Sequence, residues 1–165
     1  MSSEGLPPND GNGSGEMPPG RMQILAQYVK DLSFENPGAP LNPAVRPAID
    51  LGVDLQAKRV ETDQYEVDLR LRVSAKVEDK TAFLLELSYA AIVLAQNIPE
   101  DILPQLLLIE APHLLFPFAR RVVADTIRDG GMPPLMVEPI DFAQLYRAKA
   151  EQQQQQQILN PSATA

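Results

Sequence analysis

The chain has 165 residues and is acidic: 14 lysines and arginines stand against 22 aspartates and glutamates, which gives a formal net charge of −8 and an isoelectric point near 4.6. Hydrophobic residues make up 44% of the sequence and charged residues 22%, the composition of a folded domain of ordinary size. The absence of cysteine excludes disulfides, thiolate nucleophiles and cysteine-ligated zinc, and a single histidine cannot form a histidine-rich metal site.

Hydropathy and charge also limit the location and the partners that we expect. No run of about 18 apolar residues could cross a bilayer, and the N-terminus lacks the basic start and apolar stretch of a signal peptide. We therefore expect a cytoplasmic protein that does not insert into a membrane. Because an acidic surface repels phosphate, nucleic acid is not an expected partner.

Both ends of the chain have the composition of tails around one central domain. Residues 1–20 are dominated by glycine, proline, serine and asparagine, so we expect a disordered N-terminal arm. Residues 151–165 begin with a tract of six glutamines and are expected to form a flexible C-terminal tail. Glutamine is a fair helix former, so the tract could also prolong a preceding helix. The domain itself is expected to span residues 21–150.

The first half of the domain has the alternating pattern of β-strands. Four strands are expected, over residues 22–35, 48–60, 64–78 and 81–94. The proline-rich stretch 37–47 is expected to be an extended connection, because proline is unfavourable in helices and central strands. A tight turn at Asp79 and Lys80 should join the last two strands into an antiparallel hairpin.

The second half of the domain has helical signals. Residues 99–101 are typical of a first helical turn, and a second helix is expected over residues 111–129, where two glycines end it. Asp141 can cap a last helix. Strands followed by helices predict an α+β fold, with a four-stranded antiparallel sheet and helices packed on one of its faces.

A search for catalytic constellations gives no candidate. His113 has no serine or cysteine nucleophile identifiable beside it, and a packing role at a helix entry explains it. Asp50 and Asp54 lie on the polar side of a strand, where solvated carboxylates are ordinary. We therefore expect no catalytic residue, no cofactor and no metal, with a small-molecule enzyme on an α+β sheet as an alternative.

The sequence carries more apolar surface than one sheet and its helices can cover. Both sides of the strand expected at residues 81–94 carry bulky residues, and the segment from Leu106 to Ile109 is apolar all round. Surface of this kind usually ends in an oligomer interface or a binding groove. Symmetric association would supply the missing cover.

Four strings of residues, in this order, resemble the SecB family of protein-export chaperones. They are KDLSFENPGAP at 30–40, YEVDLRLRVSA at 65–75, TAFLLEL at 81–87 and HLLFPFARRVVADTIRDGGMPPLMVEPIDFAQLY at 113–146. The resemblance implies a SecB-like fold and a cytoplasmic homotetramer, a dimer of dimers, that holds unfolded secretory precursor proteins and delivers them to the SecA motor of the translocase. A related alternative is a SecB-like chaperone dedicated to one antitoxin.

The resemblance also implies roles for two sets of strand residues. The SecA-binding positions of the family match four residues of this sequence: Asp31, Glu35, Leu84 and Glu86. Even spacing places the two residues of each strand on one side of it. The dimer-to-dimer contact is expected at the long helix and at three further residues, Leu85, Leu87 and Tyr89. From the residues alone, core packing within one subunit is equally plausible for these three.

A holding chaperone also needs exposed apolar and aromatic surface on which many unfolded segments can pack. The expected client groove is built from six residues: Ile49, Leu51 and Val53 on the second strand, and Phe142, Leu145 and Tyr146 on the last helix. The alternative for these side chains is ordinary packing between the sheet and the helix.

Overall fold

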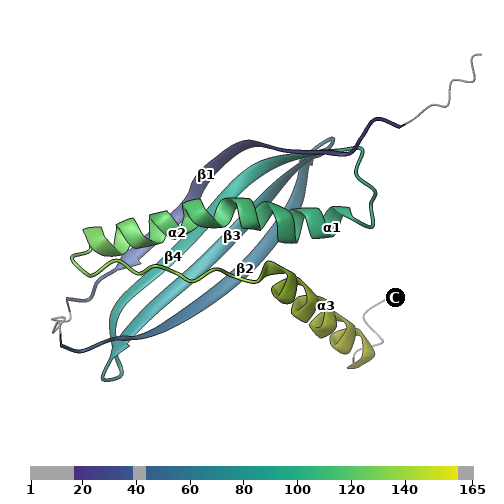
Figure 1. The fold of residues 1–165 in the computed structure, drawn as a ribbon. Coiled ribbons are helices and arrows are strands. Elements are labelled where there is room, and N and C mark those ends of the chain that lie inside the picture. Colours follow the sequence, from purple (N-terminus) through teal and green to yellow (C-terminus); the bar gives the residue numbers. More distant parts are fainter. Residues whose placement is uncertain (1–16, 39–43, 160–165) are drawn as a thin grey trace, which may run out of the picture.

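A computed structural model, which describes residues 17–38 and 44–159, shows an α+β fold (Figure 1). One antiparallel sheet contains β1 (Arg21–Glu35), β2 (Ala48–Glu61), β3 (Gln64–Val77) and β4 (Lys80–Gln96). The helical part follows as α1 (Leu103–Gln105), the π-helical segment η1 (Leu106–Glu110), α2 (Ala111–Asp129) and α3 (Phe142–Leu159). The prediction of a four-stranded antiparallel sheet with helices on one face is confirmed.

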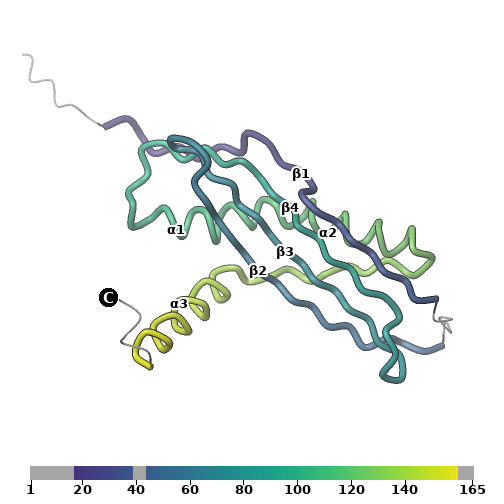
Figure 2. The backbone as a smooth tube through the Cα atoms, turned by 180° about the vertical axis from the view of Figure 1, so that it is seen from behind, coloured from purple at the N-terminus to yellow at the C-terminus, as the bar shows by residue number. Residues whose placement is uncertain are grey.

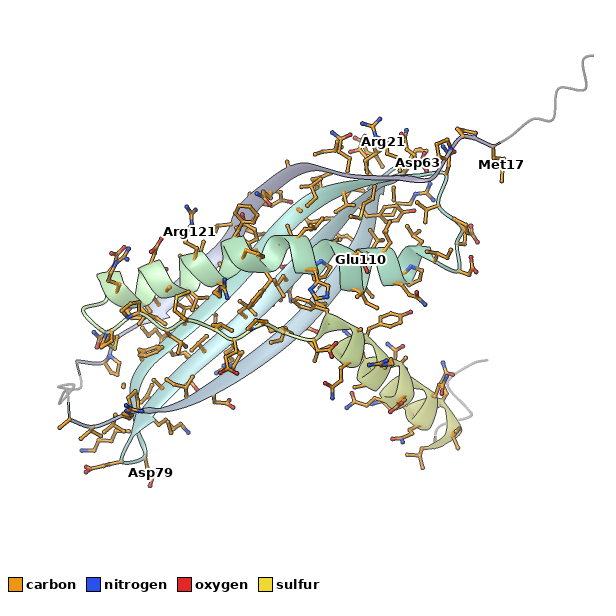
Figure 3. The ribbon with its side chains drawn as sticks, in the orientation of Figure 1. Met17, Arg21, Asp63, Asp79, Glu110 and Arg121 are labelled. Atoms are coloured by element: carbon orange, nitrogen blue, oxygen red, sulfur yellow. The ribbon has the colours of Figure 1, made fainter. Side chains whose placement is uncertain are left out.

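The strands lie in the order β1-β4-β3-β2, so β1 and β2 are the two outer strands of this sheet (Figure 2). β2, β3 and β4 follow one another as hairpins whose turns lie at opposite ends of the sheet, with Asp63 at one end and Asp79 at the other (Figure 3). The turn expected at Asp79 and Lys80 is shifted by one residue, because Val77 pairs with Lys80. Glu78 and Asp79 therefore form the turn, and both have positive φ angles, of 49° and 63°.

Strict alternation along β3 and β4 separates an apolar face of the sheet from a polar one. The apolar side chains of β3 and β4 that are less than 10% exposed on the helix-covered face are Val67, Leu69, Leu71, Val73, Ala75, Phe83, Leu85, Leu87, Tyr89, Ala91, Val93 and Ala95. α2 packs against this face through buried residues that include Leu115, Phe116 and Val123. Each fully buried aliphatic side chain contributes about 1.5 to 3 kcal/mol to folding. The helices do not cover the other face of the sheet (Figure 1). We call it the open face.

The two helices expected before residue 130 form one continuous helical run. Its backbone stays in the α region from α1 through η1 into α2, and the N–H group of Ala111 bonds to the carbonyl group of Leu106 across the wider π turn. Pro112 follows directly and has no N–H group with which to continue the α pattern. At residue 111, where the sequence predicts a second helix start, the backbone therefore passes from the π segment into α2 without a break.

The tails are described in part. α3 continues through the glutamine tract to Leu159, so the tract prolongs the helix, and the flexibility expected for residues 151–165 stays a prediction. Of the expected disordered arm, residues 1–16 lie outside the described residues, and residues 17–20 form neither helix nor strand. Within the described part of the chain, no helix is long and apolar enough to cross a membrane.

Candidate functional site

The four residues expected to bind SecA lie together on the open face of the sheet. In the pairing of β1 with β4, Glu35 lies opposite Leu84 and Asp31 lies opposite Ser88. Glu86 pairs with Ser33, between these two positions. The three carboxylates are exposed and Leu84 is half-buried. A bulge between Val29 and Asp31 precedes this stretch, so the stretch itself keeps the regular alternation that the sequence predicted.

The ion pair nearest to these acids joins the neighbouring strands. Arg72 on β3 lies directly opposite Glu86, and its Nη1 atom is 3.2 Å from Glu86 Oε1. Both side chains are about half exposed or more, at 66% and 48%, so this pair contributes little to stability and leaves the carboxylate accessible. The acidic patch is therefore an exposed surface, and Lys30 and Arg70 line the same hollow as Asp31, Arg72 and Glu86.

The three residues expected at the dimer-to-dimer contact are in the core of the single chain. Leu85, Leu87 and Tyr89 are 0%, 2% and 7% exposed and belong to the apolar face beneath the helices. Side chains that are covered to this extent within one subunit leave little surface for contact with a second one. The alternative stated for these residues, core packing within one subunit, is therefore the arrangement that the structure shows.

Apolar surface does stay uncovered on the outer sides of two neighbouring elements. On α2, Leu114 and Phe118 are 48% and 43% exposed, and on β1, Val29 and Leu32 are 44% and 40% exposed. The register places Val29 and Leu32 opposite Tyr89 and Leu87, so both point to the helix-covered side of the sheet. The exposed apolar margin on this side of the molecule therefore lies on α2 and β1 rather than on β4.

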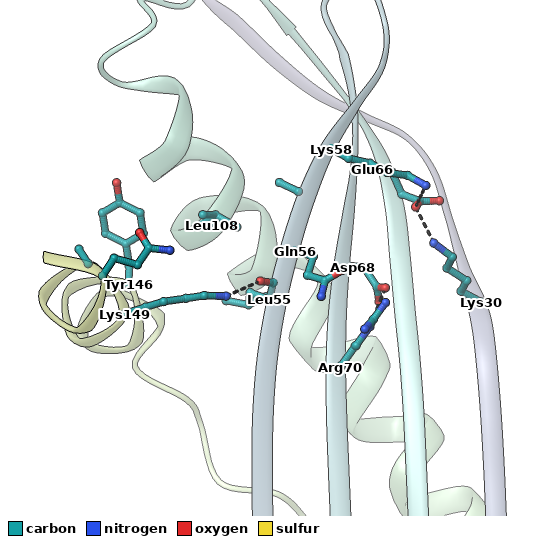
Figure 4. Close-up of a pocket in the computed structure, with 13 residues that line it drawn as sticks. Lys30, Leu55, Gln56, Lys58, Glu66, Asp68, Arg70, Leu108, Tyr146 and Lys149 are labelled. Carbon is teal, nitrogen blue, oxygen red and sulfur yellow. Dashed lines mark hydrogen bonds and ion pairs between the residues drawn. The ribbon is translucent and has the colours of Figure 1, made fainter. Parts of the chain in front are cut away.

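Two carboxylates on the open face, Glu66 and Asp68, are buried. Glu66 accepts hydrogen bonds from Tyr28 Oη at 2.5 Å and from Lys30 Nζ at 2.6 Å, and Lys58 Nζ lies 3.3 Å from the same carboxylate (Figure 4). The partners come from β1 and β2, so Glu66 on β3 connects both outer strands. Its position on the polar side of β3 follows from the sequence alternation, but its burial does not.

Asp68, one alternation step further along β3, is satisfied in the same way. It accepts hydrogen bonds from Ser88 Oγ at 2.6 Å and from Arg70 Nε at 3.0 Å. Ala90 on β4 lies between Asp68 and Tyr28 in the register and has a side chain too short to separate β1 from β3. No signal within one strand reveals the burial of Glu66 and Asp68, because it depends on donors from neighbouring strands.

The hydrogen bonds shift two pKa values in opposite directions. Donation from Lys30 and from Tyr28 outweighs burial and lowers the pKa of Glu66 to about 2. The hydrogen bond to Glu66, followed by burial, raises the pKa of Tyr28 to about 12. At neutral pH, Glu66 is therefore ionised and Tyr28 is protonated.

Part of the expected client groove lies between β2, η1 and α3. Val53, Leu145 and Tyr146 line a pocket of about 280 Å³ together with Leu55 and Leu108, which the sequence analysis did not select. Leu108 is supplied by the π-helical segment, a position that could not be assigned without knowing where the helix runs.

Two further groove candidates extend this surface along β2. Ile49 and Leu51 point to the same side of β2 as Val53 and are 42% and 37% exposed. They are not among the residues that line the pocket. The apolar surface therefore continues from the pocket toward the start of β2 as an exposed strip.

Phe142 does not line the groove, because its side chain is 0% exposed. Its ring lies edge-on to His113 and to Phe116 of α2, with centroid separations of 5.2 and 6.1 Å. Phe142 is the first residue of α3, so burial of its ring holds the start of that helix against α2. It positions one wall of the groove, and the packing alternative is correct for this residue.

Comparison with known proteins agrees with this geometry. Residues 15–155 match the family model described as preprotein translocase subunit SecB. The chain belongs to the SecB family. It is similar to proteins named protein-export protein SecB from Parvibaculum lavamentivorans (50% identical, covering 87% of this chain and 86% of that one) and Maricaulis maris (52%, covering 78% and 77%). A third such relative, from Sinorhizobium medicae, is 46% identical and covers 95% of this chain and 96% of its own.

The SecB fold is also found in a solved structure. The SecB-like chaperone of Mycobacterium tuberculosis, in complex with a ChAD peptide from an antitoxin, superposes with a TM-score of 0.64 at 18% identity, covering 73% of this chain and 91% of that one. At this identity the likeness is one of fold. SecB proteins are chaperones rather than enzymes, so family membership favours the export chaperone over the enzyme alternative.

The buried carboxylate of this SecB-family sheet should support stability in a pH-dependent way. The folded pKa of Glu66, about 2, lies below the ordinary value of 4.5, so its contribution is complete above about pH 4.5 and is lost as the pH falls toward 2. Glu66→Gln should lower the free energy of unfolding at pH 7 by about 1 to 3 kcal/mol. The deficit relative to the natural chain should shrink at pH 3, as measured by urea unfolding.

Glu61→Gln is the matched control, because Glu61 is an exposed glutamate on an outer strand whose side chain forms no ion pair with another of the described residues. It should leave the free energy of unfolding unchanged within about 0.5 kcal/mol. A Glu66→Gln protein as stable as the control at pH 7 would show that the buried carboxylate contributes nothing.

Proposed function

We propose that this SecB-family protein binds unfolded secretory precursors in the cytoplasm, keeps them unfolded and delivers them to the SecA motor. The observation that supports this most strongly is the separation of two surfaces on one sheet. The acidic patch of Asp31, Glu35 and Glu86 is on the open face, and the apolar groove at β2 is on the helix side. One protein could therefore hold a client and contact the motor at the same time.

SecA docking on the open face rests on charge and exposure. Glu35 lies opposite the half-buried Leu84, Glu86 is its next neighbour on the same side of β4, and Asp31 lies further along β1, so the patch is a row of exposed carboxylates with an apolar side chain at one end. Such a surface attracts a basic segment over a Debye length of about 8 to 10 Å and then gains from apolar contact. The SecA roles of Asp31, Glu35, Leu84 and Glu86 are part of this proposal.

Client binding at the groove rests on apolar side chains beside a sheet edge. Lys149 Nζ donates to the backbone carbonyl of Leu55 at 3.2 Å, which shows that this carbonyl points outward from β2 toward α3. In an antiparallel strand, residues two apart point their backbone groups the same way, so Val53 and Leu51 also present N–H and C=O groups outward. An extended segment could pair with this edge and place its apolar side chains in the groove.

The homotetramer, a dimer of dimers, is a further part of the proposal. Its contacts are assigned to the apolar margin formed by Leu114 and Phe118 on α2 and by Val29 and Leu32 on β1. A closed symmetric assembly would cover this margin and bring several client grooves together. Several weak sites on one particle give tight but reversible capture of a long unfolded chain.

Reversing one charge on the open face should separate the two functions. Glu86→Lys places a cation beside Arg72 in the acidic patch, so binding of SecA should weaken about tenfold or more while capture of an unfolded precursor stays unchanged. Both affinities are measured by isothermal titration calorimetry. Glu61→Lys, the same charge change at an exposed position away from the patch, is the control. Equal loss of both activities, or of neither, would contradict the assignment.

A polar substitution in the apolar strip should have the opposite effect. Leu51→Asp removes a half-exposed apolar contact at β2 and should weaken capture of an unfolded precursor about three- to tenfold, with SecA binding preserved. Ile158→Asp, at an apolar side chain that is 78% exposed near the end of α3, is the control. If Leu51→Asp and the control bind the precursor equally well, β2 does not belong to the client groove.

A further inference from the structure

The open face carries a hollow of about 570 Å³ that extends from the acidic patch across β3 to β2. Asp31 and Glu86 of the patch line one side of it, and Gly52 and Asp54 of β2 line the other. Arg72 of β3 lies between the two sides, opposite Glu86 on β4 and opposite Gly52 on β2. This arginine therefore has acidic residues on both neighbouring strands.

The two arginines that line the hollow are held differently. Arg70 donates from Nε to Oδ2 of Asp68 at 3.0 Å, and the side chain of Asp68 is only 5% exposed (Figure 4). Arg72 contacts the exposed carboxylate of Glu86 at 3.2 Å, and its side chain forms no hydrogen bond with another of the described residues. An exposed pair of this kind contributes little to stability, so Arg72 can leave Glu86 at small cost.

Glycine at position 52 leaves the space beside Arg72 open. A glycine inside a strand is unfavourable, because it has no side chain to pack and loses more backbone freedom on folding than other residues. A Cβ atom at Gly52 would lie 3.7 Å from the Cβ atom of Arg72, which is an ordinary van der Waals distance. Packing within this chain therefore does not require glycine here, and the space is available to the Arg72 side chain.

Two carboxylates of β2, Asp50 and Asp54, flank this space on the open face. Each lies two residues from the position opposite Arg72, so both are diagonal neighbours of that arginine. Diagonal positions in a sheet are about 7 to 8 Å apart, within reach of a long side chain. Asp54 is shared with Lys149 at 3.3 Å, whereas Asp50 is exposed and forms no ion pair with another described residue. An Arg72 side chain turned toward β2 would therefore still have a carboxylate partner.

We propose that Arg72 is a displaceable countercharge that limits the affinity of the acidic patch for SecA. In the unbound protein it neutralises Glu86. A cation of the docking segment takes its place there, and Arg72 turns over Gly52 toward Asp50, so the displaced guanidinium group keeps a partner. This inference rests on the proposed docking of SecA and adds the residue that sets its strength.

A merely structural role of Arg72 predicts a change of opposite sign. If the ion pair served to present Glu86, its removal would weaken docking. Competition for Glu86 predicts that removal of Arg72 strengthens docking, because the carboxylate is then free and a cation that repels a basic segment is gone. The direction of the change in affinity therefore distinguishes the two roles.

Arg72→Gln in the full chain should bind SecA about two- to fivefold more tightly than the natural chain, as measured by isothermal titration calorimetry at low salt. The gain should shrink as salt is raised. Arg59→Gln, the same charge change at an exposed arginine of β2 that does not line the hollow, is the control and should give a smaller gain. In a Glu86→Gln background, Arg72→Gln should gain no more than this control, because no carboxylate is freed.

Gly52→Val tests the turn toward β2. A valine side chain has room beside Arg72 but occupies the space into which Arg72 turns, so SecA should bind about two- to threefold more weakly. In a chain that also carries Arg72→Gln, the valine should have no effect, because nothing has to turn. A valine that weakens binding equally with and without Arg72, or has no effect in its presence, would overturn the inference.

The inference and the proposed docking can fail separately. If Arg72→Gln binds SecA no more tightly than Arg59→Gln while Glu86→Lys still weakens binding, the inference is wrong and the docking site stands. If the natural chain does not bind SecA, or if Glu86→Lys binds it equally well, the proposed docking itself fails. Thermal unfolding establishes that each variant is folded, and Arg72→Met, which keeps the aliphatic stem, replaces Arg72→Gln if that variant is not.

Discussion

Packing of α2 against one face of an alternating sheet is the constraint on which the rest of this structure depends. The buried side chains of β3 and β4 and those of α2 form one core, which includes Leu71, Leu85 and Val123. Because one long helical run covers only one face, the other face is left to polar and charged residues. The same arrangement leaves the outer side of α2 and the apolar side of β1 partly exposed. The proposed docking face and the proposed association surface both depend on this single packing arrangement.

The open face is more than a solvated surface. Glu66 and Asp68 are buried there at 9% and 3% exposure, and their partners come from every other strand of the sheet. Burying a carboxylate without partners is costly, whereas these two accept several hydrogen bonds each. They hold the side chains of Lys30 and Arg70 in place on the open face. The polar side of the sheet is consequently both a structural layer and a set of positioned charges.

Much of the fold could be predicted from the sequence, because alternation and turn residues are local signals. The four strands, the antiparallel hairpin, the common side of Asp31 and Glu35 and the common side of Leu84 and Glu86 all follow from period-two patterns. Predictions that needed three-dimensional context were less successful. Phe142 and Leu85 are large apolar residues of the kind found at interfaces, yet the structure buries both side chains within one chain. The continuous helix across Pro112 depends on a π turn, and the burial of Glu66 depends on partners from β1 and β2, neither of which a local pattern reveals.

The central claim is that apolar surface left uncovered by one chain is shared between further copies of the chain and unfolded polypeptides. Native mass spectrometry of the purified protein, with and without a denatured secretory precursor, measures both parts of this claim at once. The account predicts a particle of four chains that retains the precursor. A single chain that retains no precursor would contradict it.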